Sequence, residues 1–97
     1  MNTQWLPVYQ LIRHALRDLR EQSELTQIQL ATQLEKPQSY VSKIESGERK
    51  IDVLDVRNYC RACGTDWLTF LTTLEQKMTE LEKQNTIASR SGKNKKI

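Results

Sequence analysis

The polar residues best suited to bind a partner in this 97-residue chain are concentrated between positions 38 and 43. If residues 38–46 form one helix, Val41 and Ile44 face inward, and the outward residues are Gln38, Ser39, Tyr40, Ser42 and Lys43. Their amide, hydroxyl and ammonium groups can bond to base edges and phosphate oxygens, as in double-stranded DNA. Acidic residues return only near the end of the segment, at Glu45 and Glu48. This face therefore favours a nucleic-acid partner.

A second short helix must hold that face in place. Thr26 followed three residues later by Gln29 is a capping box, and it predicts a helix over 27–34. We expect the apolar face of this helix to consist of Ile28, Leu30, Ala31 and Leu34. Pro37 disfavours helical geometry at Lys36, so the chain turns there and restarts as the helix 38–46, which ends at Gly47. Two such helices let one brace on the DNA backbone while the next enters the major groove.

Three further helices surround this pair. Apolar residues at helical spacing predict a helix over about 8–22, with Pro7 in its first turn: Val8, Leu11, Ile12, Ala15, Leu16 and Leu19. Asp52 caps a fourth helix that stops at Gly64, with the expected buried stripe Val53, Val56, Tyr59, Cys60 and Cys63. Asp66 caps a fifth helix, from Trp67 into the low 80s. The fold class is therefore all-α, a compact arrangement of five helices.

Composition agrees with one small helical domain. The 37% hydrophobic content supports a single core, and 3 Gly and 2 Pro with few aromatic residues argue against a sandwich or barrel. No apolar run approaches the roughly 20 residues of a spanning helix, and the first seven residues lack the pattern of a signal peptide. We therefore expect a soluble, cytoplasmic protein that does not enter a membrane.

The net charge of +3 arises at the end of the chain. Residues 1–88 contain 11 basic and 12 acidic side chains, whereas residues 89–97 contain four basic side chains and no acidic one. The overall basicity therefore does not identify a DNA-binding face on the folded part. Residues 89–97 are expected to be a disordered basic tail, with a phosphate-binding arm as the alternative.

The region from residue 11 to about 70 resembles the Cro/repressor-like, or XRE-type, helix-turn-helix family. The most specific parts of the match are Leu25-Thr26-Gln27 through Ala31 and the run from Gln38 to Arg49. Two positions depart from the family pattern. Glu35 lies in the turn where a small residue or Gly is common, and Pro37 replaces the usual Ser or Thr cap.

The resemblance implies a role for each matching residue. Gln27 would touch a phosphate and help to orient Gln38; the base-reading residues would be Gln38, Ser39 and Lys43, with Tyr40 and Ser42 divided between bases and backbone. Arg49 and Lys50 would hold the phosphate backbone. Arg20 and Glu45 would form a structural ion pair that clamps the groove helix to the scaffold.

The remaining reactive side chains do not suggest catalysis. Cys60 and Cys63 form a C-x-x-C pair, but there is no second pair, and the single histidine, His14, lies on the polar side of its helix. We interpret both cysteines as core thiols. The expectation is a protein that is not an enzyme and needs no metal or cofactor.

The fifth helix carries a possible dimer seam. Trp67, Leu71, Leu74, Met78 and Leu81 recur at steps of four and three, and Asn85 occupies the next position. This is a coiled-coil pattern, and it places Lys77 and Glu82 as an opposite-charge pair across a parallel interface. In the alternative, Trp67, Phe70 and Leu71 pack on the chain's own core, and residues 75–85 form an extension.

These observations divide the chain into a DNA-binding domain over 1–74, a candidate dimerisation segment over 67–88 and the tail over 89–97. The leading hypothesis is a sequence-specific, repressor-like transcriptional regulator that binds a palindromic operator as a homodimer. One alternative is the antitoxin of a toxin-antitoxin pair, in which a toxin protein is the main partner and DNA binding is autoregulatory. Another is a protein-docking module, which the carboxylate-free face of residues 38–43 disfavours.

Overall fold

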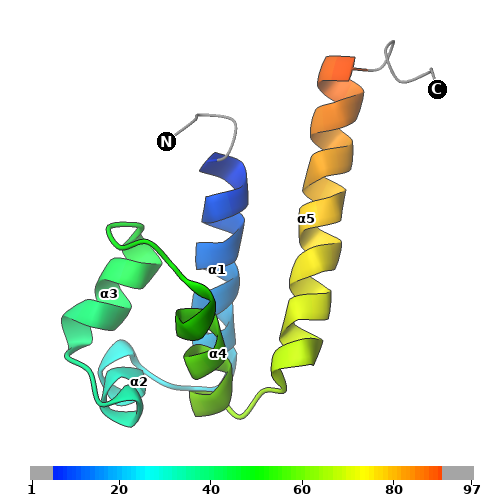
Figure 1. The fold of residues 1–97 in the computed structure, drawn as a ribbon. Coiled ribbons are helices and arrows are strands. Elements are labelled where there is room, and N and C mark those ends of the chain that lie inside the picture. The colour runs from blue at the N-terminus through cyan, green and yellow to red at the C-terminus, as the bar shows by residue number, and fades with distance from the viewer. Residues whose placement is uncertain (1–5, 91–97) are drawn as a thin grey trace.

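Five helices joined by short turns make up residues 6–90, the part of the chain that the computed structural model describes (Figure 1). They are α1 (Leu6–Gln22), α2 (Gln27–Leu34), α3 (Gln38–Ser46), α4 (Val53–Ala62) and α5 (Trp67–Arg90). The prediction of an all-α fold with five helices is confirmed. The bounds of α2 and α3 agree with the expected ranges, because capping and turn residues define their ends.

The turn between α2 and α3 forms without the usual signals. Helix α2, which precedes the turn, begins with the predicted capping box: Thr26 Oγ1 accepts from the Gln29 amide at 3.0 Å, and Gln29 Oε1 accepts from the Thr26 amide at 2.9 Å. Glu35 then adopts a left-handed conformation with φ of 58°, the region where glycine is usual. Pro37 precedes α3 and provides no side-chain cap. Glu35 and Pro37 therefore form this turn without the glycine and the Ser or Thr cap that the sequence resemblance led us to expect.

The core lies where the first four helices converge. Its fully buried side chains are Leu16, Leu30, Val41, Ile44, Tyr59 and Cys60. Two residues of the expected apolar faces are exposed: Ile28 is 60% exposed and Val53 is 69% exposed. Ile28 lies about 200° around the helix from Leu30, because each residue advances the helix by about 100°. Val53 is the first residue of α4, at the edge of the buried stripe.

Helix α5 runs alongside α1, and its C-terminal part continues past the beginning of α1 (Figure 1). It ends at Arg90, not in the low 80s, so Ser89 and Arg90 of the expected tail are helical. Residues 91–97, the rest of that tail, lie outside the described residues. Within the described residues, no helix is both long and apolar enough to cross a membrane.

Candidate nucleic-acid interface

The outward face of α3 carries three exposed polar side chains, those of Gln38, Ser39 and Lys43. Ser42 is half-buried beside them. On the opposite face Val41 and Ile44 are completely buried, so packing fixes the rotation of the helix about its axis. The helix therefore holds an amide, a hydroxyl and an ammonium group on one rigid surface.

Tyr40 is held by the protein itself. Its hydroxyl donates a hydrogen bond to Asp55 Oδ1 on α4. Two cations lie over its ring: the Arg49 guanidinium carbon is 4.9 Å from the ring centroid and the Lys36 ammonium nitrogen is 5.4 Å from it. Burial and the hydrogen bond to Asp55 raise the pKa of Tyr40, so the phenol stays protonated as a donor. The Tyr40 hydroxyl therefore joins α3 to α4, and the expected contact of Tyr40 with bases or backbone stays a prediction.

Asp55 is the acceptor at the centre of this contact, and it was not among the expected site residues. Its Oδ2 accepts from the Asp52 amide at 3.0 Å, and its Oδ1 lies 3.5 Å from the Arg49 guanidinium. Burial opposes ionisation, but the bonds from Asp52, Tyr40 and Arg49 outweigh it and lower the pKa of Asp55. The spacing Asp52-x-x-Asp55, a capping box made of two aspartates, was the available signal.

Gln27 connects the exposed face to the interior. Its Nε2 donates to Glu45 Oε1 at 3.1 Å, and its Oε1 accepts from Gln38 Nε2 at 3.3 Å. The expected contact between Gln27 and Gln38 is therefore present. Among the described residues, one N–H and the carbonyl oxygen of Gln38 have no hydrogen-bond partner, so both can meet an external partner.

Glu45 is the hub of the buried polar network. Arg20 donates two hydrogen bonds to it, from Nε to Oε2 at 2.8 Å and from Nη2 to Oε1 at 2.9 Å. The Tyr59 hydroxyl donates to Oε2 at 3.2 Å, and Arg20 also donates to the Leu25 carbonyl at 2.8 Å. The structure thus brings Arg20 and Glu45 together as an ion pair, and it adds Tyr59, which had been assigned only to the core.

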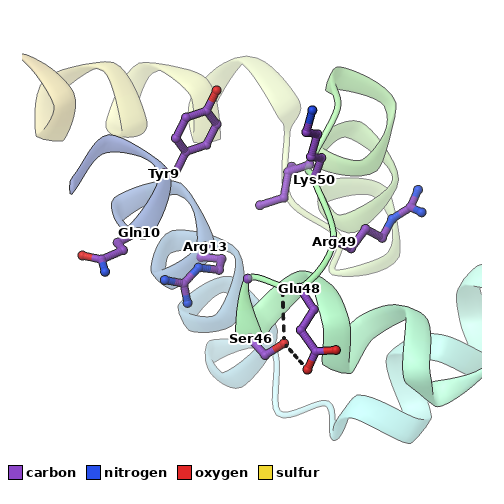
Figure 2. A pocket seen from close by; sticks show the side chains of 9 residues that line it. Tyr9, Gln10, Arg13, Ser46, Glu48, Arg49 and Lys50 are labelled. Atoms are coloured by element: carbon purple, nitrogen blue, oxygen red, sulfur yellow. Dashed lines mark hydrogen bonds between the residues drawn. The ribbon is translucent and has the colours of Figure 1, made fainter. Parts of the chain in front are cut away.

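The far end of α3 borders a hollow of about 490 Å³, formed by α1 and the α3–α4 loop (Figure 2). Lys50 and Arg13 line it, and Arg13 also donates to the Glu45 carbonyl at 3.3 Å. Gly47 adopts φ of 91°, and a Cβ there would lie 3.1 Å from the Arg13 side chain. In Figure 2 the Arg49 side chain points away from Tyr9 and Arg13, consistent with its contact to Asp55. Lys50 is therefore the freer cation of the expected backbone pair.

The proposed dimer seam on α5 is divided between two environments. Leu74 is only 8% exposed and Leu71 packs on the chain's own core. Met78 and Leu81 are half-buried, and Leu81 lines a groove against α1. The backbone of Asn85 belongs to α5, but its side chain lies outside the described residues. Leu74 is therefore not on a free surface, and dimerisation through α5 stays a prediction.

The cysteines are free thiols, Cys60 buried and Cys63 half-buried. Burial, with smaller contributions from Cys63 and Asp66, raises the pKa of Cys60 to about 11. Among the described residues there is no group of three or more His, Cys, Asp or Glu side chains placed to hold a metal ion. Burial also raises the pKa of Cys63, so both thiols are protonated at neutral pH.

A family model described as a helix-turn-helix domain matches residues 11–67. Among solved structures, an XRE-family like protein from Pseudomonas syringae pv. tomato str. DC3000 is 39% identical with a TM-score of 0.71, over 76% of this chain and 90% of that one. The clp gene regulator ClgR from Corynebacterium glutamicum has the same fold at 22% identity and a TM-score of 0.66, over 84% of this chain and 86% of that one. No curated protein matches significantly.

Proposed function

This chain belongs to the XRE-type helix-turn-helix family of DNA-binding transcriptional regulators, which are not enzymes, and from that premise we propose that it binds a palindromic operator as a homodimer. In this proposal α3 enters the major groove. Gln38, Ser39 and Lys43 contact base edges, and Ser42 lies beside them. Lys50, together with the exposed part of Arg49, holds the phosphate backbone.

One observation carries the proposal: the exposed face of α3 is polar, free of carboxylates and rigidly supported. The full burial of Val41 and Ile44 fixes the helix, so its outward donors and acceptors need no reordering on binding. Side chains that are already positioned lose less conformational entropy when they bind. Repression of transcription would follow from occupancy of the operator.

The homodimer is proposed from operator geometry. Two recognition helices that read half-sites one helical turn apart, about 34 Å, need a two-fold related partner. On the described part of α5, Met78 and Leu81 are half-buried apolar residues, and Leu81 lines a groove against α1. Because Leu74 is buried and the partly buried Leu71 packs against the core, we assign the dimer contact to the part of α5 that follows Leu74.

Selection of bound sequences from a random duplex pool tests the proposal directly. A palindromic consensus is expected, and Gln38→Ala should then cost about 1–3 kcal/mol at the preferred site and flatten the preference at one base position. Enrichment of no sequence, together with equal affinity of Gln38→Ala for all duplexes, would remove α3 from the groove.

Backbone contacts are tested by salt dependence. Lys50→Gln should weaken all duplexes similarly and lower the salt slope by about one unit. The matched control is Lys83→Gln, which removes an exposed cation from α5, a helix that is not packed on α3. Equal slopes for the two variants would contradict the backbone role of Lys50.

A further inference from the structure

A continuous series of hydrogen bonds links the core to the exposed end of α3. It starts at the Arg20–Glu45 pair, continues from Glu45 Oε1 to Gln27 Nε2 at 3.1 Å, and ends with Gln38 Nε2 on Gln27 Oε1 at 3.3 Å. The Glu45 side chain is only 4% exposed. The amide of Gln38, which reads a base in the proposed function, is therefore connected through Gln27 to the buried charge of Glu45.

The chemistry of Glu45 gives this series a direction. An ionised carboxylate only accepts hydrogen bonds, whereas a glutamine amide donates from one end and accepts at the other. Burial opposes the charge on Glu45, but bonds from Arg20 and Gln27 outweigh it and keep its pKa below the ordinary value. Gln27 must therefore turn its NH₂ group toward Glu45, which leaves its carbonyl oxygen facing Gln38. Gln38 in turn must donate to that oxygen.

We propose that Glu45 is a positioning residue that sets base specificity: through Gln27 it fixes which end of the Gln38 amide faces the DNA. This inference rests on the proposed function. Glu45 does not touch DNA, because it lies behind Gln27 and is buried between α1, α3 and α4. Its effect passes only through the orientation of two amides.

The fixed orientation leaves Gln38 with one N–H donor and one carbonyl acceptor. Adenine offers the complementary pair in the major groove, the N7 acceptor and the N6 amino donor. Guanine offers two acceptors, N7 and O6, so its O6 would oppose the Gln38 carbonyl oxygen. The opposite orientation, with the NH₂ of Gln38 facing the base, would place the Gln27 carbonyl against the Glu45 carboxylate. The geometry therefore favours adenine over guanine at the base pair that Gln38 meets.

The experiment measures the ratio of affinities for duplexes that carry adenine or guanine at that position, at fixed salt. For the wild type we expect a ratio of about 5- to 150-fold, the range for one bidentate pair. Glu45→Gln puts an amide in place of the carboxylate. With its NH₂ at the position of Oε1, this amide donates to Gln27 and permits the inverted series, although it then loses one of the two bonds from Arg20. We expect its adenine-to-guanine ratio to fall toward one.

Two further variants separate orientation from stability. Gln27→Met removes the connecting amide from a half-buried site and leaves the Arg20–Glu45 pair in place, so it serves if Glu45→Gln does not fold. Its adenine-to-guanine ratio should also fall toward one, because Gln38 can then turn freely. Tyr59→Phe is the matched control: it removes one hydrogen bond to Glu45 but leaves the charge and the bond from Gln27. Its melting temperature should fall while its ratio stays at the wild-type value.

The outcomes distinguish this inference from the function on which it rests. If every variant binds the operator and the ratios of Glu45→Gln and Gln27→Met equal that of the wild type, Glu45 has no role in specificity, although DNA binding stands. A fall in the ratio of Tyr59→Phe equal to that of Glu45→Gln would also overturn the inference, because loosening of the core would then explain both. If the wild type binds no duplex, the proposed function fails, and the inference fails with it.

Discussion

Removal of the Glu45 carboxylate should be the most destabilising single change to a charged side chain within residues 6–90. In Glu45→Ala, the Arg20 guanidinium would keep the Leu25 carbonyl as an acceptor but would lose both of its bonds to the carboxylate. The Arg20 side chain is only 10% exposed, so bulk water does not replace those bonds. Gln27 and Tyr59 would lose their acceptor as well.

The expected cost follows from that burial. Stranding one partner of a buried ion pair costs about 3–5 kcal/mol. A domain of this size is stable by about 5–15 kcal/mol in total. Since 1 kcal/mol moves the melting temperature of such a domain by about 4–8 °C, Glu45→Ala should melt at least about 12 °C below the wild type. Scanning calorimetry or circular dichroism at neutral pH measures this shift.

A matched control comes from the same helix. Arg17 and Glu21 are 3.2 Å apart, but their side chains are 57% and 50% exposed, so Arg17→Ala should cost less than about 1 kcal/mol. The double variant Arg20→Met/Glu45→Leu removes both buried charges and should regain part of the loss. A melting temperature for Glu45→Ala as high as that of Arg17→Ala would refute the reasoning.

The remaining predictions concern pH, assembly and thiol reactivity. Glu45 and Asp55 have pKa values lowered from the ordinary 4.5 and 3.8, so their contribution to the free energy of unfolding is complete above about pH 4.5 and is lost as the pH falls through the lower folded pKa values. When wild type and Glu45→Ala are unfolded at decreasing pH, the variant should therefore lose less stability. Sedimentation of the wild type should show a dimer, and Met78→Glu should weaken it. Gln76→Glu, at an exposed position of α5, is the control and should leave the dimer unchanged. A wild type that is monomeric with and without operator DNA would exclude the α5 dimer. Cys60 should react with iodoacetamide only on unfolding, since burial raises its pKa to about 11, and fast labelling of the native protein would contradict its burial.

Local signals predicted the scaffold of the interface well. The capping box at Thr26 and Gln29 begins α2, and Gly47 ends α3, so the groove helix and its support have the expected bounds. The apolar period turned Val41 and Ile44 inward and thereby left Gln38 and Lys43 outside. These features depend on contacts within a few residues or on a single helical face.

Contacts between distant helices were not predictable in the same way. Tyr40 meets Asp55 and Tyr59 meets Glu45 only because the core sets the distance between α3 and α4. Leu74 has the spacing of a dimer seam, but the same spacing serves packing on α1, and periodicity alone does not say which surface covers it. The extent of α5 was missed because its last turns have few apolar residues to mark them.

The arrangement around Glu45 also limits how this protein can change its target. One carboxylate accepts bonds from α1, α2 and α4 through Arg20, Gln27 and Tyr59, while its own backbone belongs to α3. A substitution at Glu45 would therefore alter stability and base reading together. By contrast, Ser39 and Lys43 are exposed and lie outside this network, so their replacement can change the contacted bases at little cost in stability. New operator preferences should therefore be obtained at Ser39 and Lys43 first, with Glu45 and Gln27 left in place to hold the helix and the amide of Gln38.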